Sequence, residues 1–409
     1  MNLRTLLTGL AVLVLATSCT AGSEGIFATI EKEQKVVTSG NLNTAATVTR
    51  MAELITNTTT NAGVLLVSGG EAAFTKSNST SVNTWGTSSV GQHGNVAAVG
   101  VAGSTAYAVA GGGLYQSTDG SNWSAGPSLA AGDTPYDLIP IRNPDGVTSN
   151  KLILVTMISY TDPNNSSVTI YQYGRIYLLT SGGLSATPIT LTDPTGASSA
   201  LGDPVISAAI DDGSNYYLAS NSYLWYWNGT QTTVAATTNF PSNTGFGGLI
   251  YLGTPYGTTT LINRLYVSTG IKSGTTTGGG IYVSAVTSGS PSANWGTITQ
   301  GTTTSNLPVA FGQFLYNNIN NSLWIATRNT TGTSQQGTGY MEYTLSSSSF
   351  STTPSTNSSN YSSSGLSTYA VGCLFYSLNG GGLYYLGTRS HGLWYWNETG
   401  NSSNPWTQD

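Results

Sequence analysis

Short apolar segments, several of them carrying an aromatic residue, recur along the chain at nearly regular intervals. Seven of them are GVLLVSGG (63–70), TAYAVAGG (105–112), KLILVTMIS (151–159), NYYLASNS (215–222), RLYVSTGI (264–271), SLWIATRN (322–329) and GLYYLGTRS (382–390). Each is followed by a shorter phrase that joins an apolar and an aromatic residue: Ala73-Phe74, Leu114-Tyr115, Ile176-Tyr177, Leu224-Trp225, Ile281-Tyr282, Tyr340-Met341 and Leu393-Trp394. The six steps from Phe74 to Trp394 have a mean length near 53 residues. Segments of this length and composition predict β-strands.

Two further segments complete each repeat. An apolar run such as TVTRMAEL (47–54) or YDLIPIRNPDG (136–146) precedes the first phrase, and a more polar stretch such as PWTQD (405–409) follows the second. Four short strands per unit predict an all-β chain folded as a β-propeller with seven four-stranded blades. Eight blades remain open, because GIFATIEKEQKVV (25–37) looks like a third strand running into a fourth. A solenoid is the other architecture, although terminal caps are not evident.

The repeats are unevenly spaced because three long inserts separate a predicted second strand from its third. They are SYTDPNNSSVTIYQYG (159–174), TGIKSGTTTGGG (269–280) and NTTGTSQQGTG (329–339). We expect these inserts to form long loops on one face of the disc, where loops of a propeller carry function or mobility.

Composition agrees with this fold. Charged residues make up 7% of the chain, and the remaining polarity comes from Gly, Ser, Thr and Asn, which favour turns and strands. Nine Trp and 24 Tyr supply enough bulky apolar surface for a core.

The N-terminal residues predict export with a lipid anchor. Arg4 precedes the apolar run Leu6–Ala16, which is 11 residues long and therefore too short to span a bilayer. The following Ala16-Thr17-Ser18-Cys19 resembles a bacterial lipobox, which implies a signal peptide at 1–18, acylation of Cys19, a tether at 19–24 and a single propeller domain at 25–409. An ordinary signal peptide beside a chance cysteine is the alternative. Thr20 is not the Asp that retains enteric lipoproteins at the inner membrane, so the outer membrane is expected.

The two cysteines and the net charge bear on disulfide bonding and on the class of binding partner. With Cys19 acylated, Cys373 has no partner for a disulfide, and its apolar surroundings in YAVGCLFY predict a buried thiol. Removal of residues 1–18 leaves 11 Lys and Arg against 17 Asp and Glu, a net charge of −6. A mildly acidic surface does not suit nucleic acid.

One turn carries a recognisable motif. The stretch Ser117-Thr118-Asp119-Gly120-Ser121-Asn122-Trp123 resembles the Asp-box, or BNR repeat, of sialidases and other propellers. The resemblance implies a hairpin turn in which Asp119 accepts backbone N–H groups, Gly120 permits positive φ, and Trp123 packs between strands, with Ser117 opening the motif. A catalytic or calcium-binding role for Asp119 is the less favoured alternative.

No catalytic motif stands out. Sialidases need an arginine triad, and beyond the signal peptide the arginines are Arg50, Arg142, Arg175, Arg264, Arg328 and Arg389. The segment closest to that family's arginine motif, Pro140-Ile141-Arg142-Asn143-Pro144, departs from it. His93 and His391 are the only histidines, and we find no nucleophile elbow, no zinc spacing and no P-loop. We therefore expect no cofactor and no metal.

The twin phrases Leu224–Asn228 and Leu393–Asn397, both LWYWN, suggest binding. Trp225 and Trp227 share one face of a strand, as do Trp394 and Trp396, so exposed pairs would stack sugars or contact a partner, with His391 nearby. The favoured alternative is that these tryptophans pack between blades.

As a whole the sequence looks like a bacterial β-propeller lipoprotein. We expect a non-catalytic binding or scaffold module, anchored to the membrane by lipid, with a protein or glycan partner of the cell envelope or of a host. The alternative is an exported carbohydrate-active enzyme, sialidase-like or another glycoside hydrolase or lyase, with its site at the channel mouth.

Overall fold

The structure is a computed structural model in which the regular structure of the described residues is almost entirely β. The described residues are 42, 47–70, 72–78, 85–143, 149–162, 165–185, 188, 208–211, 215–219, 224–227, 232–234, 246–253, 263–270, 279–287, 290–291, 296–300, 309–317, 322–329, 337–345, 366, 369–377, 382–396 and 406–409. Residues 1–41 lie outside this part, and with them the predicted signal peptide, Cys19, the tether and the segment 25–37. Within the described part, no helix is long and apolar enough to span a bilayer.

The strands form successive meanders, called units 1 to 7 in chain order. Unit 1 contains β1 (Arg50–Asn57), β2 (Ala62–Ser68), β3 (Ala73–Ser77) and β4 (Gly86–Thr87). Unit 2 contains β5 (Val96–Ala102), β6 (Thr105–Ala110), β7 (Gly113–Ser117) and β8 (Ser124–Ala125). Unit 3 contains β9 (Asp133–Arg142), β10 (Ser149–Asp162), β11 (Asn165–Thr180) and β12 (Gly183–Leu184). Unit 4 contains β13 (Ala208–Asp211), β14 (Tyr216–Ala219), β15 (Leu224–Trp227) and β16 (Thr232–Val234).

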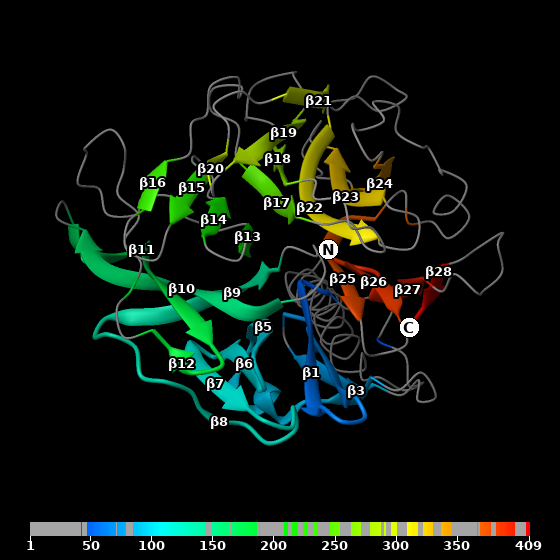
Figure 1. Cartoon of the computed structure of the whole chain (residues 1–409). Coiled ribbons are helices and arrows are strands. Elements are labelled where there is room, and N and C mark those ends of the chain that lie inside the picture. Colours follow the sequence, from blue (N-terminus) through cyan, green and yellow to red (C-terminus); the bar gives the residue numbers. More distant parts are fainter. Residues whose placement is uncertain are drawn as a thin grey trace, which may run out of the picture.

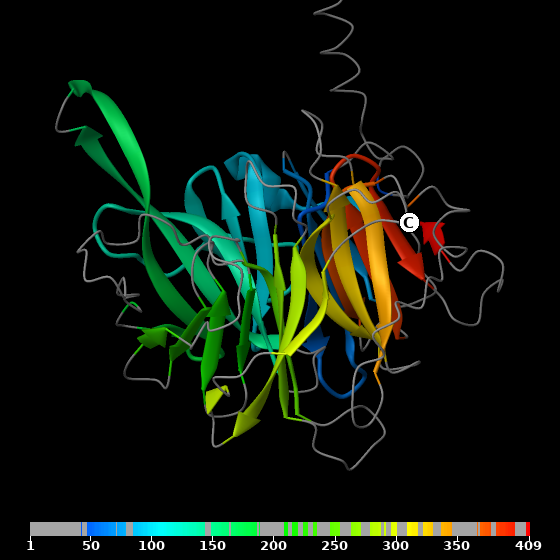
Figure 2. The same cartoon turned by 90° about the horizontal axis from the view of Figure 1, so that it is seen from above.

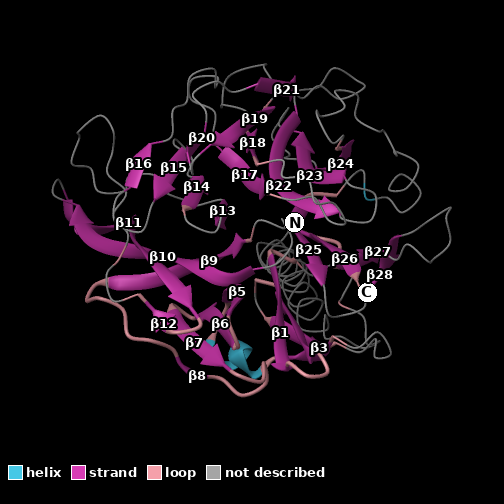
Figure 3. Ribbon diagram, viewed as in Figure 1, coloured by secondary structure: helices cyan, strands magenta, loops and turns pink. Residues whose placement is uncertain are grey.

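The remaining units follow the same plan. Unit 5 contains β17 (Phe246–Leu252), β18 (Arg264–Thr269), β19 (Gly280–Thr287), β20 (Ser290–Pro291) and β21 (Gly296–Gln300). Unit 6 contains β22 (Val309–Asn317), β23 (Ser322–Asn329) and β24 (Gly337–Thr344). Unit 7 contains β25 (Val371–Ser377), β26 (Leu383–Thr388), β27 (Leu393–Trp396) and β28 (Trp406–Gln408). The 3-10 helix η1 (Ser89–His93) connects β4 to β5 (Figure 3).

The units stand around a central axis, with the first strand of each nearest that axis (Figure 1). The predicted all-β propeller is therefore confirmed. Hydrogen bonding groups the described strands into six sheets, because units 3 and 4 share one eight-stranded sheet. In that sheet β9 and β13 pair in parallel through Ile141 with Ala209 and Arg142 with Ile210, while every other pairing is antiparallel.

Apolar side chains fill the spaces between consecutive units. The cluster between units 1 and 2 contains Leu54 and Leu66 from one side and Val99 and Ala108 from the other. Six more clusters repeat this arrangement around the ring, and the last joins unit 7 to unit 1. Strands in the middle of a unit, such as β2, β6 and β26, are thus buried on both faces, which explains their nearly continuous apolar runs in the sequence.

The ring closes where the two ends of the described chain meet. Leu42 N donates to Asp409 O at 2.8 Å, and Val48 N donates to Thr388 O at 2.7 Å. Lys76 Nζ, on β3, forms a buried ion pair with the Asp409 carboxylate. Residues from unit 1 and unit 7 therefore share both backbone and side-chain bonds.

One of the predicted insert loops is instead regular structure. Residues 159–162 and 165–174 extend β10 and β11 as a paired hairpin, with Ser159 opposite Tyr171 and Tyr160 opposite Ile170. Figure 2 shows this hairpin projecting from the disc. Alternating polar and apolar residues in VTIYQYG permit a strand, so the loop prediction for 159–174 was wrong. Most of the other two inserts lies outside the described residues.

Candidate ligand site in the central channel

A cavity of about 210 Å³ lies in the channel, bounded by the innermost strands β1, β5, β9, β22 and β25. Its polar side chains include Arg50, Glu53, Arg142, Ser149 and Gln313, and mainly apolar residues supply the rest of the wall. The volume exceeds that needed for a single water several-fold. The cavity is therefore large enough to hold a small ligand or part of a larger one.

The innermost strands place these polar groups. Along β1, Met51, Ala52 and Leu54 are buried, whereas Arg50 and Glu53 are only half-buried and line the cavity. A charged residue within an otherwise apolar inner strand has the channel as its route to solvent. Strand β1 therefore packs within unit 1 and also places two charged side chains in the cavity wall.

Arg50 is fixed by bonds that cross from one unit to another. Its Nη2 donates to Asp137 Oδ2 of β9 at 2.7 Å, and its Nη1 donates to Thr49 O at 3.1 Å. Both partners of this ion pair have side chains that are 17% exposed. Burial opposes the charge on Arg50, but the Asp137 carboxylate outweighs it and raises the pKa of Arg50 above its usual value. Arg50 is therefore a permanent cation in the cavity wall.

Two other cavity side chains form hydrogen bonds with the backbone of Leu374, on β25. Arg142 Nη2 donates to Leu374 O at 3.2 Å, and Leu374 N donates to Gln313 Oε1 at 3.4 Å. Units 3, 6 and 7 therefore meet at one residue, and two cavity side chains are oriented by it.

Glu53 is held in place as an acceptor. Its Oε1 accepts Ser377 Oγ and Asn78 Nδ2, each at 3.0 Å. Asn78 in turn accepts Gly63 N through its Oδ1 at 2.8 Å. The carboxylate of Glu53 thus takes part in a network that joins unit 1 to unit 7.

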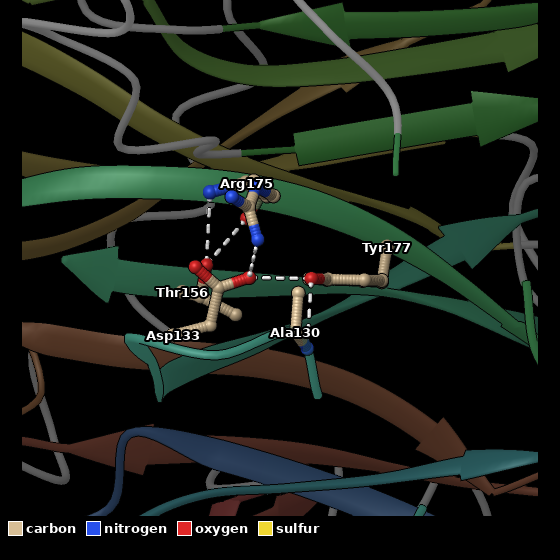
Figure 4. A network of polar contacts seen from close by, with 5 residues as sticks. All are labelled: Ala130, Asp133, Thr156, Arg175 and Tyr177. Atoms are coloured by element: carbon tan, nitrogen blue, oxygen red, sulfur yellow. Dashed lines mark hydrogen bonds and ion pairs between the residues drawn. The ribbon is translucent and has the colours of Figure 1, made fainter. Parts of the chain in front are cut away.

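A second polar network lies outside the cavity wall, at the base of the long hairpin (Figure 4). The buried Asp133 carboxylate accepts Tyr177 Oη and Arg175 Nη1, the latter at 3.3 Å. Burial and the Asp133 hydrogen bond raise the pKa of Tyr177. Thr156 Oγ1 accepts Arg175 N and donates to Arg175 O, each at 2.9 Å, where the register of β10 shifts. This network fixes the hairpin to the disc.

The tryptophans of the twin phrases lie between units. Trp225 is 4% exposed in the cluster between units 3 and 4, and Trp227 packs against the same cluster with its ring 4.6 Å from that of Tyr216. Trp396 is buried and Trp394 half-buried in the cluster between units 6 and 7. None of the four lines the channel cavity.

His391 lies in the turn between β26 and β27, away from the cavity wall. Its ring stacks on Tyr369 at 3.7 Å, and Nδ1 shares a hydrogen bond with Ser390 Oγ at 2.8 Å. Its backbone O accepts Trp394 Nε1 at 3.1 Å. The structure thus brings His391 to Trp394 but not to the channel.

The turn that resembles the Asp-box is closed by its own side chains. Asp119 Oδ1 accepts Ser121 N and Asn122 N, each at 2.8 Å, and Ser117 Oγ accepts Gly120 N at 2.8 Å. These bonds, those from Asn122 first, hold the pKa of Asp119 well below its usual range. Gly120 has φ +75°, and Trp123 Nε1 donates to Ser88 Oγ at 2.9 Å. Every hydrogen bond shown for the Asp119 carboxylate is donated by a residue of its own turn.

Cys373 lies in the cavity wall and is buried, with burial raising the pKa of its thiol to about 11. Among the described residues, no group of three or more His, Cys, Asp or Glu is placed to hold a metal ion.

Sequence reasoning missed most of the cavity. Arg142 stood out within Pro140–Pro144 and Arg50 only as one of six arginines, while Glu53 and Gln313 were not predicted. The available signal was a charged or amide residue inside a predicted inner strand, as in TVTRMAEL (47–54) and AFGQF (310–314).

Comparison with family models and with curated proteins gives no match. Among solved structures the chain is similar to an ancestral GH74 enzyme, with a TM-score of 0.54, 16% identity, and coverage of 90% of this chain and 47% of that one. It is also similar to the extracellular domain of BT4673 from B. thetaiotaomicron, with a TM-score of 0.49, 12% identity, and coverage of 85% and 38%. The chain thus spans less than half the length of these proteins. At 16% identity the likeness to the GH74 enzyme shows the fold alone.

Proposed function

We propose that this chain is an extracytoplasmic, lipid-anchored β-propeller that binds a protein or glycan partner at the cell envelope and uses its channel cavity as the ligand site. The observation that carries the proposal is the channel cavity whose charged side chains are fixed by bonds between units. Preorganised polar groups in a largely apolar pocket are typical of ligand-binding sites.

The chemistry of the carboxylates favours binding over catalysis. Asp137 is paired with Arg50, and Glu53 accepts two hydrogen bonds from protein groups. A general acid or base must instead exchange protons with the substrate at a pKa near the working pH. Fixed acceptors of this kind shape a site and set its charge.

Binding is tested with the full chain immobilised and probed with an array of bacterial and host glycans. We expect selective binding that is lost in Ile55→Trp, which places a large side chain in the cavity wall. The matched control is Thr58→Trp, an exposed position on the same unit, which should bind as the parent does. Binding that survives Ile55→Trp in a folded protein contradicts the channel as the ligand site.

The second candidate function is an exported carbohydrate-active enzyme, which two arginines and a glutamate in one cavity favour. Aryl glycosides of neutral and acidic sugars are the substrates to assay. Turnover that disappears in Glu53→Gln while the array binding remains would establish the enzyme and overturn the assignment of the cavity to binding without catalysis.

Anchoring has its own test. Cys19→Ala should move the protein from the membrane fraction to the soluble fraction, because a single acylated residue supplies the anchor in this proposal. Protein that stays equally membrane-bound contradicts lipidation at Cys19.

A further inference from the structure

The long hairpin of β10 and β11 has backbone edges that no neighbouring strand covers. Strand β9 pairs with β10 only as far as the pair of Ile158 with Asp133, and the two-residue strand β12 pairs with β11 only at its C-terminal end. Within the described residues, no strand pairs with the outer side of β11 between Asn165 and Tyr177. The backbone groups along such an edge are left to water unless another strand adds to it.

The sequence of this edge is that of a strand that pairs readily. Residues 165–173 of β11, called the arm edge below, read NSSVTIYQY and include β-branched and aromatic residues but no charged residue and no proline. Natural proteins protect long edges with Lys, with inward-pointing charges or with proline. None of these devices is present in the arm edge, so its sequence does not oppose the addition of another strand.

The length and position of the arm edge also favour an added strand. Its nine residues span about 30 Å at roughly 3.3 Å per residue, whereas an average strand has about five or six residues. The hairpin projects from the disc, which places the arm edge away from the sheets of the other units (Figure 2). Because a two-stranded hairpin alone is marginally stable in water, further strands stabilise it.

We propose that the arm edge pairs with the arm edge of a second copy of the chain in one antiparallel ladder. An antiparallel edge is self-complementary, since a two-fold rotation places the donors of one copy opposite the acceptors of the other. An identical edge also matches in length, and two uncharged edges do not repel each other. Full overlap centres the two-fold axis on Thr169 and joins two hairpins into a four-stranded sheet. This inference does not depend on the channel cavity or on its ligand.

Sedimentation velocity of the full chain tests the pairing. Every sample carries Cys19→Ala, so that no acyl chain contributes to association. A single added ladder is smaller than a standard protein interface, so we expect a reversible dimer with a dissociation constant of about 1–100 µM. Replacing Tyr160–Ile170 by Asn-Gly removes most of the arm edge and should leave a monomer at concentrations that span this range.

A charge pair at Thr169 separates strand pairing from other kinds of association. Thr169→Lys and Thr169→Glu each place like charges opposite each other at the two-fold axis, so each should weaken the dimer about three- to tenfold. An equimolar mixture of the two variants should dimerise at least as tightly as the parent, because Lys then faces Glu. Thr58→Lys, at an exposed position in the turn between β1 and β2, is the matched control and should dimerise as the parent does. The thermal midpoint of each variant establishes that it is folded.

Three results overturn the inference. These are a parent chain that stays monomeric throughout the concentration range, a truncated variant that dimerises as the parent does, and a mixture of the Thr169 variants that associates no more tightly than either variant alone. Flotation with vesicles of phosphatidylethanolamine and phosphatidylglycerol tests the other occupant of the arm. A monomeric parent that floats with these vesicles, while the truncated variant does not, assigns the arm to a lipid surface and rejects the second copy.

Discussion

Individual acidic residues in this chain differ in what their oxygens face. Asp119 directs its carboxylate at the amides of its own turn, whereas Asp137 and Glu53 reach across to other parts of the ring. The first arrangement depends only on neighbouring residues, so a local motif can reveal it. The second depends on which strands meet at the axis, and a short stretch of sequence does not contain that information.

The turn at Asp119 contributes stability that depends on pH. Because its folded pKa is depressed, this contribution is present above the unfolded value of about 3.9 and is lost as the pH falls through the lower folded pKa. Asp119→Ala should lower the free energy of unfolding by about 1 kcal/mol at pH 7, a modest figure because the turn is partly exposed. Urea titrations at pH 7 and pH 3 should show the difference shrinking at the lower pH.

The neighbouring Thr118, which is exposed, provides the control for this turn. Thr118→Ala should change the free energy of unfolding by less than about 0.5 kcal/mol at either pH. An Asp119→Ala deficit that grows on acidification would contradict the assigned direction of the pKa shift.

The thiol of Cys373 should react slowly with alkylating reagents. Burial raises its pKa to about 11, so at pH 8 its thiolate fraction is roughly 200-fold below that of a free cysteine of pKa about 8.5. In a Cys19→Ala chain Cys373 is the only thiol, and iodoacetamide labelling followed by mass spectrometry reports on it alone. We expect labelling to be at least 100-fold slower in the native protein than in urea, and equal rates would place the thiol in solvent.

At the level of strands, the order of the strands and the position of the turns could be predicted from the sequence. Aromatic and β-branched runs such as TAYAVAGG (105–112) and SLWIATRN (322–329) became β6 and β23, because both faces of each strand are covered by neighbours. The hairpin of β10 and β11 was predicted as a loop, because its Ser and Asn residues favour turns in isolation and masked the alternating pattern of VTIYQYG. Pairing between two extended arms supplied the backbone hydrogen bonds that outweigh this preference.

The same hairpin should be dispensable for folding. Beyond Ile158, which is opposite Asp133, β10 pairs with β11 alone. Replacing Tyr160–Ile170 by Asn-Gly would join the paired residues Ser159 and Tyr171 through a two-residue turn. Thermal unfolding followed by circular dichroism should give a midpoint within about 2 °C of the parent, since a ΔΔG near zero shifts the midpoint little in a chain of this size.

Thr156→Val is the contrasting variant, at the base of the hairpin. It leaves the partly buried backbone N and O of Arg175 without the Thr156 hydroxyl, so we expect a loss of about 1–3 kcal/mol. If the truncation costs as much as this substitution, the projecting arm contributes to the stability of the disc and the prediction is wrong.

The whole molecule is stabilised as a ring in which each unit packs between two others. Close approach at the seam shows this: a Cβ on Gly372 of unit 7 would lie 2.0 Å from Val48 O, next to unit 1. The ring also creates the ligand cavity, because its walls come from five different units. Closure of the ring and formation of the site are therefore one structural event.

The Lys76–Asp409 ion pair makes this closure testable. Both side chains are buried, at 6% and 2% exposure, and Lys76 Nζ also lies 5.1 Å from the centre of the Trp85 ring and 5.7 Å from that of Tyr385. Asp409→Asn leaves a buried cation without its counter-charge, so it should cost about 3–5 kcal/mol of unfolding free energy in urea titrations. The double variant Lys76→Met with Asp409→Asn should recover most of that loss, because no unpaired charge remains. Single and double variants that are both as stable as the parent would mean that the ring closes without help from this ion pair, leaving the backbone bonds of Leu42 and Val48 and the apolar cluster between units 7 and 1 to hold the seam.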